Sequence, residues 1–258
     1  MFARLARPSA AAVEAAIARV FPDLAAAQRA ALVRAIGRRR VLDRLLNAAA
    51  VFCPPLGRLA ARFVAVEGSA SLAPAGRPLI VVSAHIGPIF LLMAVVRRCL
   101  HGRRVILVHA QDDPHFALVL RFVESLGFIS ALRGAGSSRK LLRAMRADPE
   151  VVIVTAFDSV IQPNRTVAFM GRTVVASSGV AALADLGAAD VVPFFWVWGR
   201  RRPRVVFEPP LRIARSLPLH QRREALTAAL FAAASARIRA QPAAWNSWGA
   251  FPDDAAGG

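Results

Sequence analysis

The sequence predicts an α/β protein in which a mixed, mostly parallel β-sheet is flanked by helices and preceded by a helical appendage. From Glu67 onward, short apolar runs alternate with helical stretches, which is typical of strands joined by crossover helices. The residues before Glu67 form helical patterns rich in arginine. We therefore divide the 258-residue chain into a basic helical segment (1–66), an α/β domain (67–250) and a disordered tail (251–258).

Two helices are expected at the start of the basic segment. Ser9 can cap a helix that reaches about Phe21, and Asp23 can cap another that reaches Ile36. Gly37 is expected to interrupt the second helix, because glycine is a poor helix former.

An apolar stripe follows at helical spacing and consists of Val41, Leu42, Leu45 and Leu46. Arginines surround it at positions 29, 34, 38, 39, 40 and 44. Cys53-Pro54-Pro55 is expected to end the helical run. Two interpretations stay open here: contact with a membrane surface, or an ordinary solvated face of helices that pack on the main domain.

The α/β domain contains five apolar runs that suit buried strands: Leu79–Ala84, Arg104–Ala110, Val151–Phe157, Asp190–Trp198 and Arg204–Glu208. Helices are expected at Pro88–Leu100, His115–Leu126, Ser137–Ala147, Ser177–Leu186 and Leu219–Ala240. Ser137 and Ser177 are expected N-caps, and Gly127 and Gly187 are expected C-terminal stops.

The location of the protein is indicated by several weak signals. Leu79–Val96 carries no formal charge over eighteen residues, yet its central His, Gly and Pro favour a strand followed by a helix over a membrane span. The N-terminus has no continuous apolar region of the kind found in signal peptides. Cys53 and Cys99 lie apart, without metal-ligand spacing, which fits a reducing cytoplasm. No metal or cofactor is predicted.

Charge limits the class of partner. The net charge is +18, and every basic residue except Lys140 is arginine, so the protein should attract polyanions. Nucleic acid is disfavoured, because the chain has no tyrosine, its aromatic residues lie inside apolar runs, and no nucleic-acid-binding motif is present. The expected partner is an anionic membrane surface, with the protein peripheral on the inner face of the bacterial cytoplasmic membrane.

Three polar residues follow predicted strands or strand-like elements. His85 follows the first strand, Asp158 follows VVIVTAF, and Arg133 closes FISALRG. Because the carboxyl ends of parallel strands meet at one edge of a sheet, these residues could form a general-base site with an anion contact. Each also has an ordinary structural interpretation: a helix-capping histidine, a turn-capping aspartate beside Ser159, and a surface arginine.

Five motifs follow one another along the chain: SAHIGPIF, VVIVTAFDS, VAFMGR, SSGVAALADLGAADVVPFF and QPAAWNSW. Their order resembles the lysophospholipid acyltransferase-like superfamily, in particular its late lipid A acyltransferase branch, with a glycerolipid acyltransferase-like fold. SAHIGPIF is similar to the block in which a strand leads to a histidine motif, and VVIVTAFDS to a later strand that ends in aspartate. VAFMGR resembles the Phe-Phe-Gly block, SSGVAALADLGAADVVPFF the following helix and strand, and QPAAWNSW the tryptophan-rich end. The resemblance covers about residues 67 to 250.

The resemblance implies that His85 takes a proton from an acceptor hydroxyl, which attacks an acyl thioester on acyl carrier protein or coenzyme A. The family places an acid five residues after this histidine to orient it, but here that position is Phe90. Three explanations stay open: Asp158 orients His85, the acceptor is an amine or another nucleophile that needs less assistance, or catalysis has been lost.

Further residues are expected to bind substrate. Phe90 and the aromatic run at 194–198 could line an acyl pocket, although most of that run also suits a filled core. Arg201, in an arginine cluster, could meet phosphate, a headgroup or an acidic carrier, and Arg133 an anion. Phe169 and Gly171 belong to the Phe-Phe-Gly-like block.

The sequence thus predicts an acyltransferase that acts on an amphiphilic, lipid-like acceptor. The alternative is an inactive homologue that binds lipid or acylated carrier as a partner protein. No N-terminal membrane anchor is evident, which favours a specialised lipid or secondary-metabolite pathway.

Overall fold

The computed structural model describes residues 9–73, 76–109, 117–134, 136–158, 165–212 and 216–251. The main sheet has seven strands: β1 (Ala65–Glu67), β2 (Leu79–Ser83), β3 (Val105–His109), β4 (Phe128–Leu132), β5 (Val152–Ala156), β8 (Asp190–Val197) and β9 (Arg204–Phe207). Their order is β1-β9-β8-β2-β5-β3-β4, and every neighbouring pair is parallel except β8 with β9. The predicted mixed, mostly parallel sheet is confirmed. The predicted strand end at Ala110, the helix start at His115 and the tail after Phe251 lie outside the described residues.

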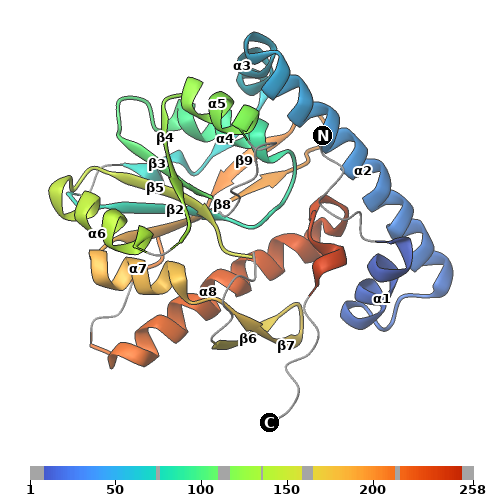
Figure 1. Cartoon of the computed structure of the whole chain (residues 1–258). Coiled ribbons are helices and arrows are strands. Elements are labelled where there is room, and N and C mark those ends of the chain that lie inside the picture. The colour runs from blue at the N-terminus through green and yellow to red at the C-terminus, as the bar shows by residue number, and fades with distance from the viewer. Residues whose placement is uncertain are drawn as a thin grey trace.

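Helices cover both faces of the sheet (Figure 1). The crossover helices are α4 (Ile89–Cys99), α5 (Ala117–Ser125), α6 (Ser137–Ala147) and α7 (Gly179–Gly187), and α8 (Leu219–Ala240) follows β9. From β2 through β3 to β4 the chain advances in one direction along the sheet, and from β4 through β5 to β8 it returns. Because such crossovers are right-handed, α4 and α5 lie on one face, while α6 and α7, with α8 beside α7, lie on the other.

The helices before the sheet correct two expectations. They are α1 (Ala10–Val20), capped by Ser9 as expected, α2 (Ala26–Phe52) and α3 (Pro54–Phe63). Gly37 does not interrupt α2, since tertiary packing of a long helix outweighs the cost of one glycine, about 1 kcal/mol. Helix α2 begins after Ala25 rather than at Asp23, and Gln28 Oε1 accepts the Ala25 N–H at 2.9 Å. Cys53-Pro54-Pro55 ends α2 but starts α3, because proline suits the first turn of a helix.

The β6–β7 hairpin, β6 (Arg165–Phe169) with β7 (Arg172–Ala176), was not expected as a separate two-stranded sheet. Its turn places Met170 and Gly171 at positive φ. Two cap assignments are also corrected: α6 has Gly136 at its N-cap instead of Ser137, and α7 has Ser178 instead of Ser177.

The core runs through the sheet and into the N-terminal helices. Phe194, Phe195 and Trp196 are 0–1% exposed on β8, so they fill the core instead of an acyl pocket. Ile17 of α1 and Ile36 of α2 belong to the same buried cluster. The division of the chain near residue 67 stays a prediction. Within the described residues, none of the helices combines the length and the apolar character required to cross a bilayer.

Candidate active site

His85 and Asp158 are brought together by two neighbouring strands in register. Strands β2 and β5 are parallel, and Ser83 at the end of one pairs with Ala156 at the end of the other. His85 and Asp158 each lie two residues beyond these partners. The shared register therefore delivers both side chains to the same point of the carboxyl edge.

The two side chains form a tightly paired dyad. His85 Nδ1 and Asp158 Oδ1 are 2.5 Å apart. Asp158 Oδ2 accepts the backbone N–H of His85 at 2.9 Å, the indole N–H of Trp245 at 3.0 Å and the hydroxyl of Ser247 at 3.5 Å. The Asp158 side chain is 2% exposed and that of His85 is 37% exposed. The carboxylate is thus enclosed, and Nε2 is the ring nitrogen left for a substrate.

The electrostatics of the dyad suit a general base. The Asp158 charge raises the pKa of His85 above its usual value, although burial opposes the rise. Burial by itself would raise the pKa of Asp158, but the His85 charge and the hydrogen bonds from His85 and Trp245 hold it below its usual value. An ionised Asp158 accepts a hydrogen bond from Nδ1–H, which keeps the proton of the neutral His85 ring on Nδ1 and leaves Nε2 with a free lone pair.

The turn that carries His85 requires glycine. Gly87 has φ +75°, and a Cβ there would lie 2.5 Å from Cγ of the buried Trp196. The Gly87 N–H donates to the Ala244 carbonyl at 2.9 Å, and Ile86 forms an isolated bridge with Trp245. The C-terminal tryptophan-rich segment therefore holds the turn from outside the sheet.

Phe90 lies in the first turn of α4, partly buried. Its backbone N–H donates to Asn47 Oδ1 of α2 at 2.9 Å. Asp158, two residues after the end of β5, provides the carboxylate contact that the resembled motif places at position 90. Of the three explanations for the missing acid, this geometry agrees with the one in which Asp158 orients His85.

The other predicted site residues lie on separate elements of the fold. Phe169 is 2% exposed and packs edge-on to Trp245, with ring centroids 5.5 Å apart. Gly171 forms the hairpin turn. Arg133 follows β4, and its guanidinium lies 4.0 Å from where a Cβ on Gly179 would be. Arg201 is exposed in the turn between β8 and β9. Their roles in binding stay predictions.

Residues 245–247 and Asn47 contact the site, and sequence reasoning did not assign them. Residues 245–247 belong to the motif QPAAWNSW, but nothing in the sequence indicated that Trp245 and Ser247 donate hydrogen bonds to Asp158. Asn47 is one of three non-basic polar residues on α2, with Gln28 and Asp43, and it is the single polar residue between Leu45 and Phe52; this was its available signal.

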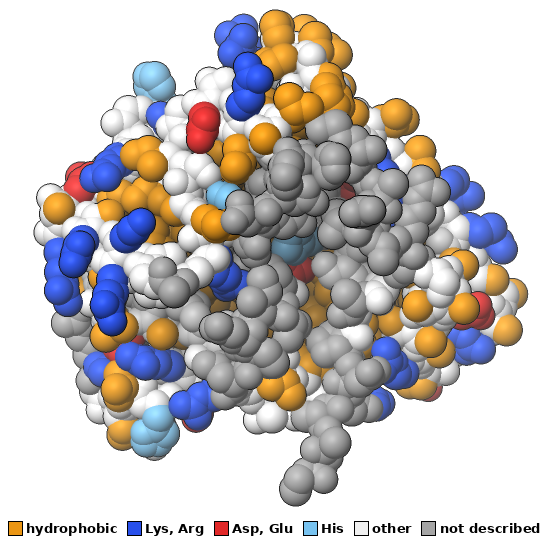
Figure 2. All heavy atoms as spheres, viewed as in Figure 1, with side chains coloured by type: hydrophobic (Ala, Val, Ile, Leu, Met, Phe, Trp, Pro, Cys, Tyr) orange, Lys and Arg blue, Asp and Glu red, His pale blue; other side chains and the backbone are white. Residues whose placement is uncertain are grey.

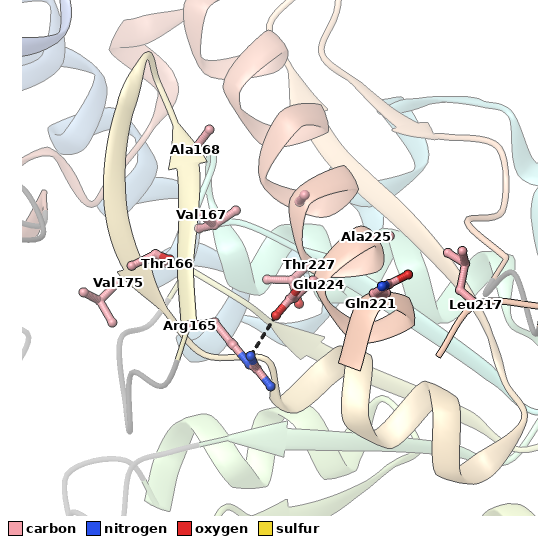
Figure 3. Close-up of a pocket in the computed structure, with 11 residues that line it drawn as sticks. Arg165, Thr166, Val167, Ala168, Val175, Leu217, Gln221, Glu224, Ala225 and Thr227 are labelled. Atoms are coloured by element: carbon pink, nitrogen blue, oxygen red, sulfur yellow. Dashed lines mark hydrogen bonds and ion pairs between the residues drawn. The ribbon is translucent and has the colours of Figure 1, made fainter. Parts of the chain in front are cut away.

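A groove lies beside the β6–β7 hairpin (Figure 3). It is open, with a volume of about 870 Å³, between the β6–β7 hairpin and α8, and an Arg165–Glu224 ion pair of 2.8 Å lies across its wall. The lining residues are Arg165, Thr166, Val167, Ala168, Val175, Leu217, Gln221, Glu224, Ala225, Thr227 and Ala228. Within the described residues, none of these side chains forms a hydrogen bond with His85 or Asp158.

Asp43, on α2, is a second buried carboxyl near the site. It is 2% exposed, and burial raises its pKa to about 7, while the Arg39 charge and the Asn246 amide oppose that rise. Neither carboxyl oxygen meets hydrogen-bond geometry with a described residue. The ionised form is therefore poorly compensated.

Replacing Asp43 by asparagine should stabilise the protein in alkaline solution. The folded-state pKa lies above the usual 3.8, so the folded protein loses stability as pH rises between about 4 and 7. Each pKa unit corresponds to about 1.4 kcal/mol, so the gain at pH 8 should reach at most about 4 kcal/mol and disappear near pH 4. Urea unfolding at both pH values measures it, with exposed Asp23→Asn as control. An equal gain at both pH values would contradict this account.

A histidine–carboxylate dyad at the carboxyl edge of a mostly parallel sheet defines a protein that can activate a hydroxyl or amine as a nucleophile. The chain belongs to the bacterial lipid A biosynthesis acyltransferase family, whose sequence model matches residues 1–248. It is an acyltransferase of lipid substrates, as the sequence predicted.

The structure is similar to the crystal structure of the 1-acyl-sn-glycerophosphate (LPA) acyltransferase PlsC from Thermotoga maritima, with a TM-score of 0.46 and 11% identity. That similarity covers 79% of this chain and 100% of the other. No curated protein matches the chain.

Proposed function

We propose that this acyltransferase moves a fatty acyl group from an acyl carrier protein or coenzyme A thioester to a hydroxyl or amine of an amphiphilic acceptor. The observation that carries the proposal is the dyad, in which Asp158 occupies Nδ1 of His85 and leaves Nε2 for the acceptor. The intact dyad and the family match favour this function over an inactive partner protein.

The proposed reaction uses the dyad twice. Nε2 of His85 takes the proton from the acceptor O–H or N–H as the acceptor atom attacks the thioester carbonyl. The tetrahedral intermediate then expels the thiolate, which receives that proton from the imidazolium. The products are an ester or amide and a free thiol. Asp158 stabilises the imidazolium between the two transfers and holds the ring in one tautomer.

We place the reaction in a specialised lipid or secondary-metabolite pathway at the inner face of the cytoplasmic membrane. Phe90 supports this choice, because the carboxylate beside His85 comes from Asp158 and not from position 90, where the resembled motif has its acid. The acyl donor is acyl carrier protein or coenzyme A, and the acidic carrier would suit the strongly basic chain.

The function is tested with purified protein, acyl thioesters of both donor types and amphiphilic acceptors with a free hydroxyl or amine. Acyl-dependent product and free thiol should appear together. Mass analysis of lipids from cells with and without the protein should show a species that differs by one acyl group. Failure of both experiments would rule the function out.

An exposed apolar stripe on α2 and α3 supports the membrane surface as a partner. Its members lie three, four or seven residues apart: Leu42, Leu45, Phe52, Leu56, Leu59 and Phe63. Their exposed fractions run from 39% at Leu42 to 69% at Phe63. Figure 2 shows hydrophobic side chains gathered over α3 beside Lys and Arg side chains. Helices with one apolar and one basic face bind the headgroup region of anionic bilayers.

Membrane binding should depend on both the apolar stripe and charge. A double variant Leu45→Asp, Phe63→Asp should bind anionic vesicles at least about 100-fold more weakly, because the loss of two buried apolar side chains costs about 3–6 kcal/mol. Binding of the unaltered protein should weaken with salt, since the exposed arginines 38 and 200–202 are screened. Vesicle co-sedimentation at low and high salt measures both effects.

Ile129→Asp is the matched control, because Ile129 is 46% exposed on β4, outside the stripe. It should bind as the unaltered protein does. An equal loss of vesicle binding in Ile129→Asp, or vesicle binding that is the same at low and high salt, would contradict docking through α2 and α3.

A further inference from the structure

Helix α2 has two functionally different faces. Its outward face carries the apolar stripe. Its inward face carries Arg40, Asp43 and Asn47, which follow one another at steps of three and four residues and therefore lie on one side of the helix. The outward face accounts for proposed membrane binding, but it does not explain why three polar residues point into the molecule.

Asn47 supplies a cap that α4 lacks. The N-cap position of α4 is Pro88, which provides no side-chain acceptor for the first turn. Asn47 Oδ1 accepts the Phe90 N–H at 2.9 Å and so satisfies one of the free donors of that turn. Helix caps are normally local in sequence, whereas this one comes from a helix 43 residues earlier.

Asn246 holds the other end of the same turn. Its backbone N–H donates to the His85 carbonyl at 2.8 Å, and its side-chain Nδ2 donates to the Gly87 carbonyl at 2.9 Å. Its own carbonyl accepts Arg40 Nη2 of α2 at 3.0 Å. Helix α2 is therefore connected to both ends of the turn that carries His85.

We propose that Asn47 and Asn246 are positioning residues for acyl transfer, which together hold the His85 turn so that the imidazole stays against Asp158. The proposal rests on the proposed function of the dyad. The residues between β2 and α4 have no regular hydrogen-bond ladder, so these contacts and those of Ala244 and Trp245 determine where His85 lies. A displacement of about 1 Å at a reacting group can cost about 100-fold in rate.

The test compares three single variants with a matched control. Asn47→Ala removes the cap, and Asn47→Asp keeps an acceptor at the same place. Asn246→Ala keeps the backbone contact with His85 and removes the amide contact with Gly87. The control is Gln28→Ala, which removes the side-chain acceptor at the start of α2, a contact that does not involve the His85 turn.

Asn47→Ala and Asn246→Ala should lower kcat by about 10- to 100-fold with little change in KM, because the dyad, rather than substrate binding, is disturbed. Asn47→Asp should have a kcat within a few-fold of that of the unaltered protein. Gln28→Ala should change thermal stability but leave kcat unchanged. Equal kcat in all four variants, or no recovery with Asn47→Asp, would overturn the proposal.

A second measurement does not depend on turnover. The imidazole pKa of His85, followed by NMR, should fall in Asn47→Ala and Asn246→Ala as the contact with Asp158 loosens, and stay constant in Gln28→Ala. An unchanged pKa in the two alanine variants would overturn the positioning role. If the unaltered protein transfers no acyl group while the pKa shifts as expected, the proposed function fails and the positioning role stands.

Discussion

A protein with His85→Asn should lose acyl transfer by about 10⁶-fold, close to the complete loss seen when the base of a hydrolytic triad is removed. Nε2 is the only ring nitrogen of His85 that is not held by Asp158, and asparagine offers no basic nitrogen in its place. Its amide can still donate to Asp158 where Nδ1 does now. The buried carboxylate thus keeps a partner, and the variant should stay folded.

His85→Ala is the companion variant, because it removes both the base and the partner of Asp158. It should be equally inactive and also less stable, by about 3–5 kcal/mol, since a buried charge loses its counterpart. Steady-state turnover and thermal unfolding of the two variants separate catalysis from stability. Turnover of His85→Asn within a few-fold of the unaltered protein would exclude His85 as the base.

Asp158→Asn should lower the rate by about 10⁴-fold with the geometry preserved. Two N–H donors, from His85 and Trp245, point at Oδ2 and would keep the amide oxygen on that side. The amide nitrogen would then face Nδ1 and donate to it. The ring proton would move to Nε2, where the lone pair is needed, so the base would be in the wrong tautomer.

The pH profile provides an independent readout of this pair. The unaltered enzyme should gain activity as pH rises through a midpoint above 6.5, because Asp158 raises the pKa of His85 and only the neutral ring accepts a proton. In Asp158→Asn the residual activity should have a lower midpoint. The dependence of kcat/KM on pH measures both, and Trp245→Phe, which removes one donor to Oδ2, should have a much smaller effect. Identical midpoints in enzyme and variant would contradict the dyad.

The sequence by itself determined the fold class and the two residues of the dyad. The repeat of apolar residues, every 2 residues in a strand and every 3.6 in a helix, is a local property, so five strands of the main sheet (β2, β3, β5, β8 and β9) and the crossover helices could be placed to within a few residues. Strand β1 and the β6–β7 hairpin were not expected. Because parallel strands share a carboxyl edge, His85 and Asp158 could be expected together although 73 residues separate them. Local propensity misjudged Gly37 and Pro54, where packing of α2 and α3 outweighed a single residue.

Only the tertiary structure decided how the dyad is held. Trp245, Ser247 and Asn246 reach the site from the end of the chain, and Asn47 reaches it from α2. A single hydrogen-bonding side chain has no periodicity and no fixed spacing from its partner. Its role appears only when distant segments pack, because hydrogen bonds act over about 3 Å and depend on angle. The resemblance places an acid at position 90, where this chain has Phe90, and the structure has a carboxylate beside His85 from Asp158, two residues after β5.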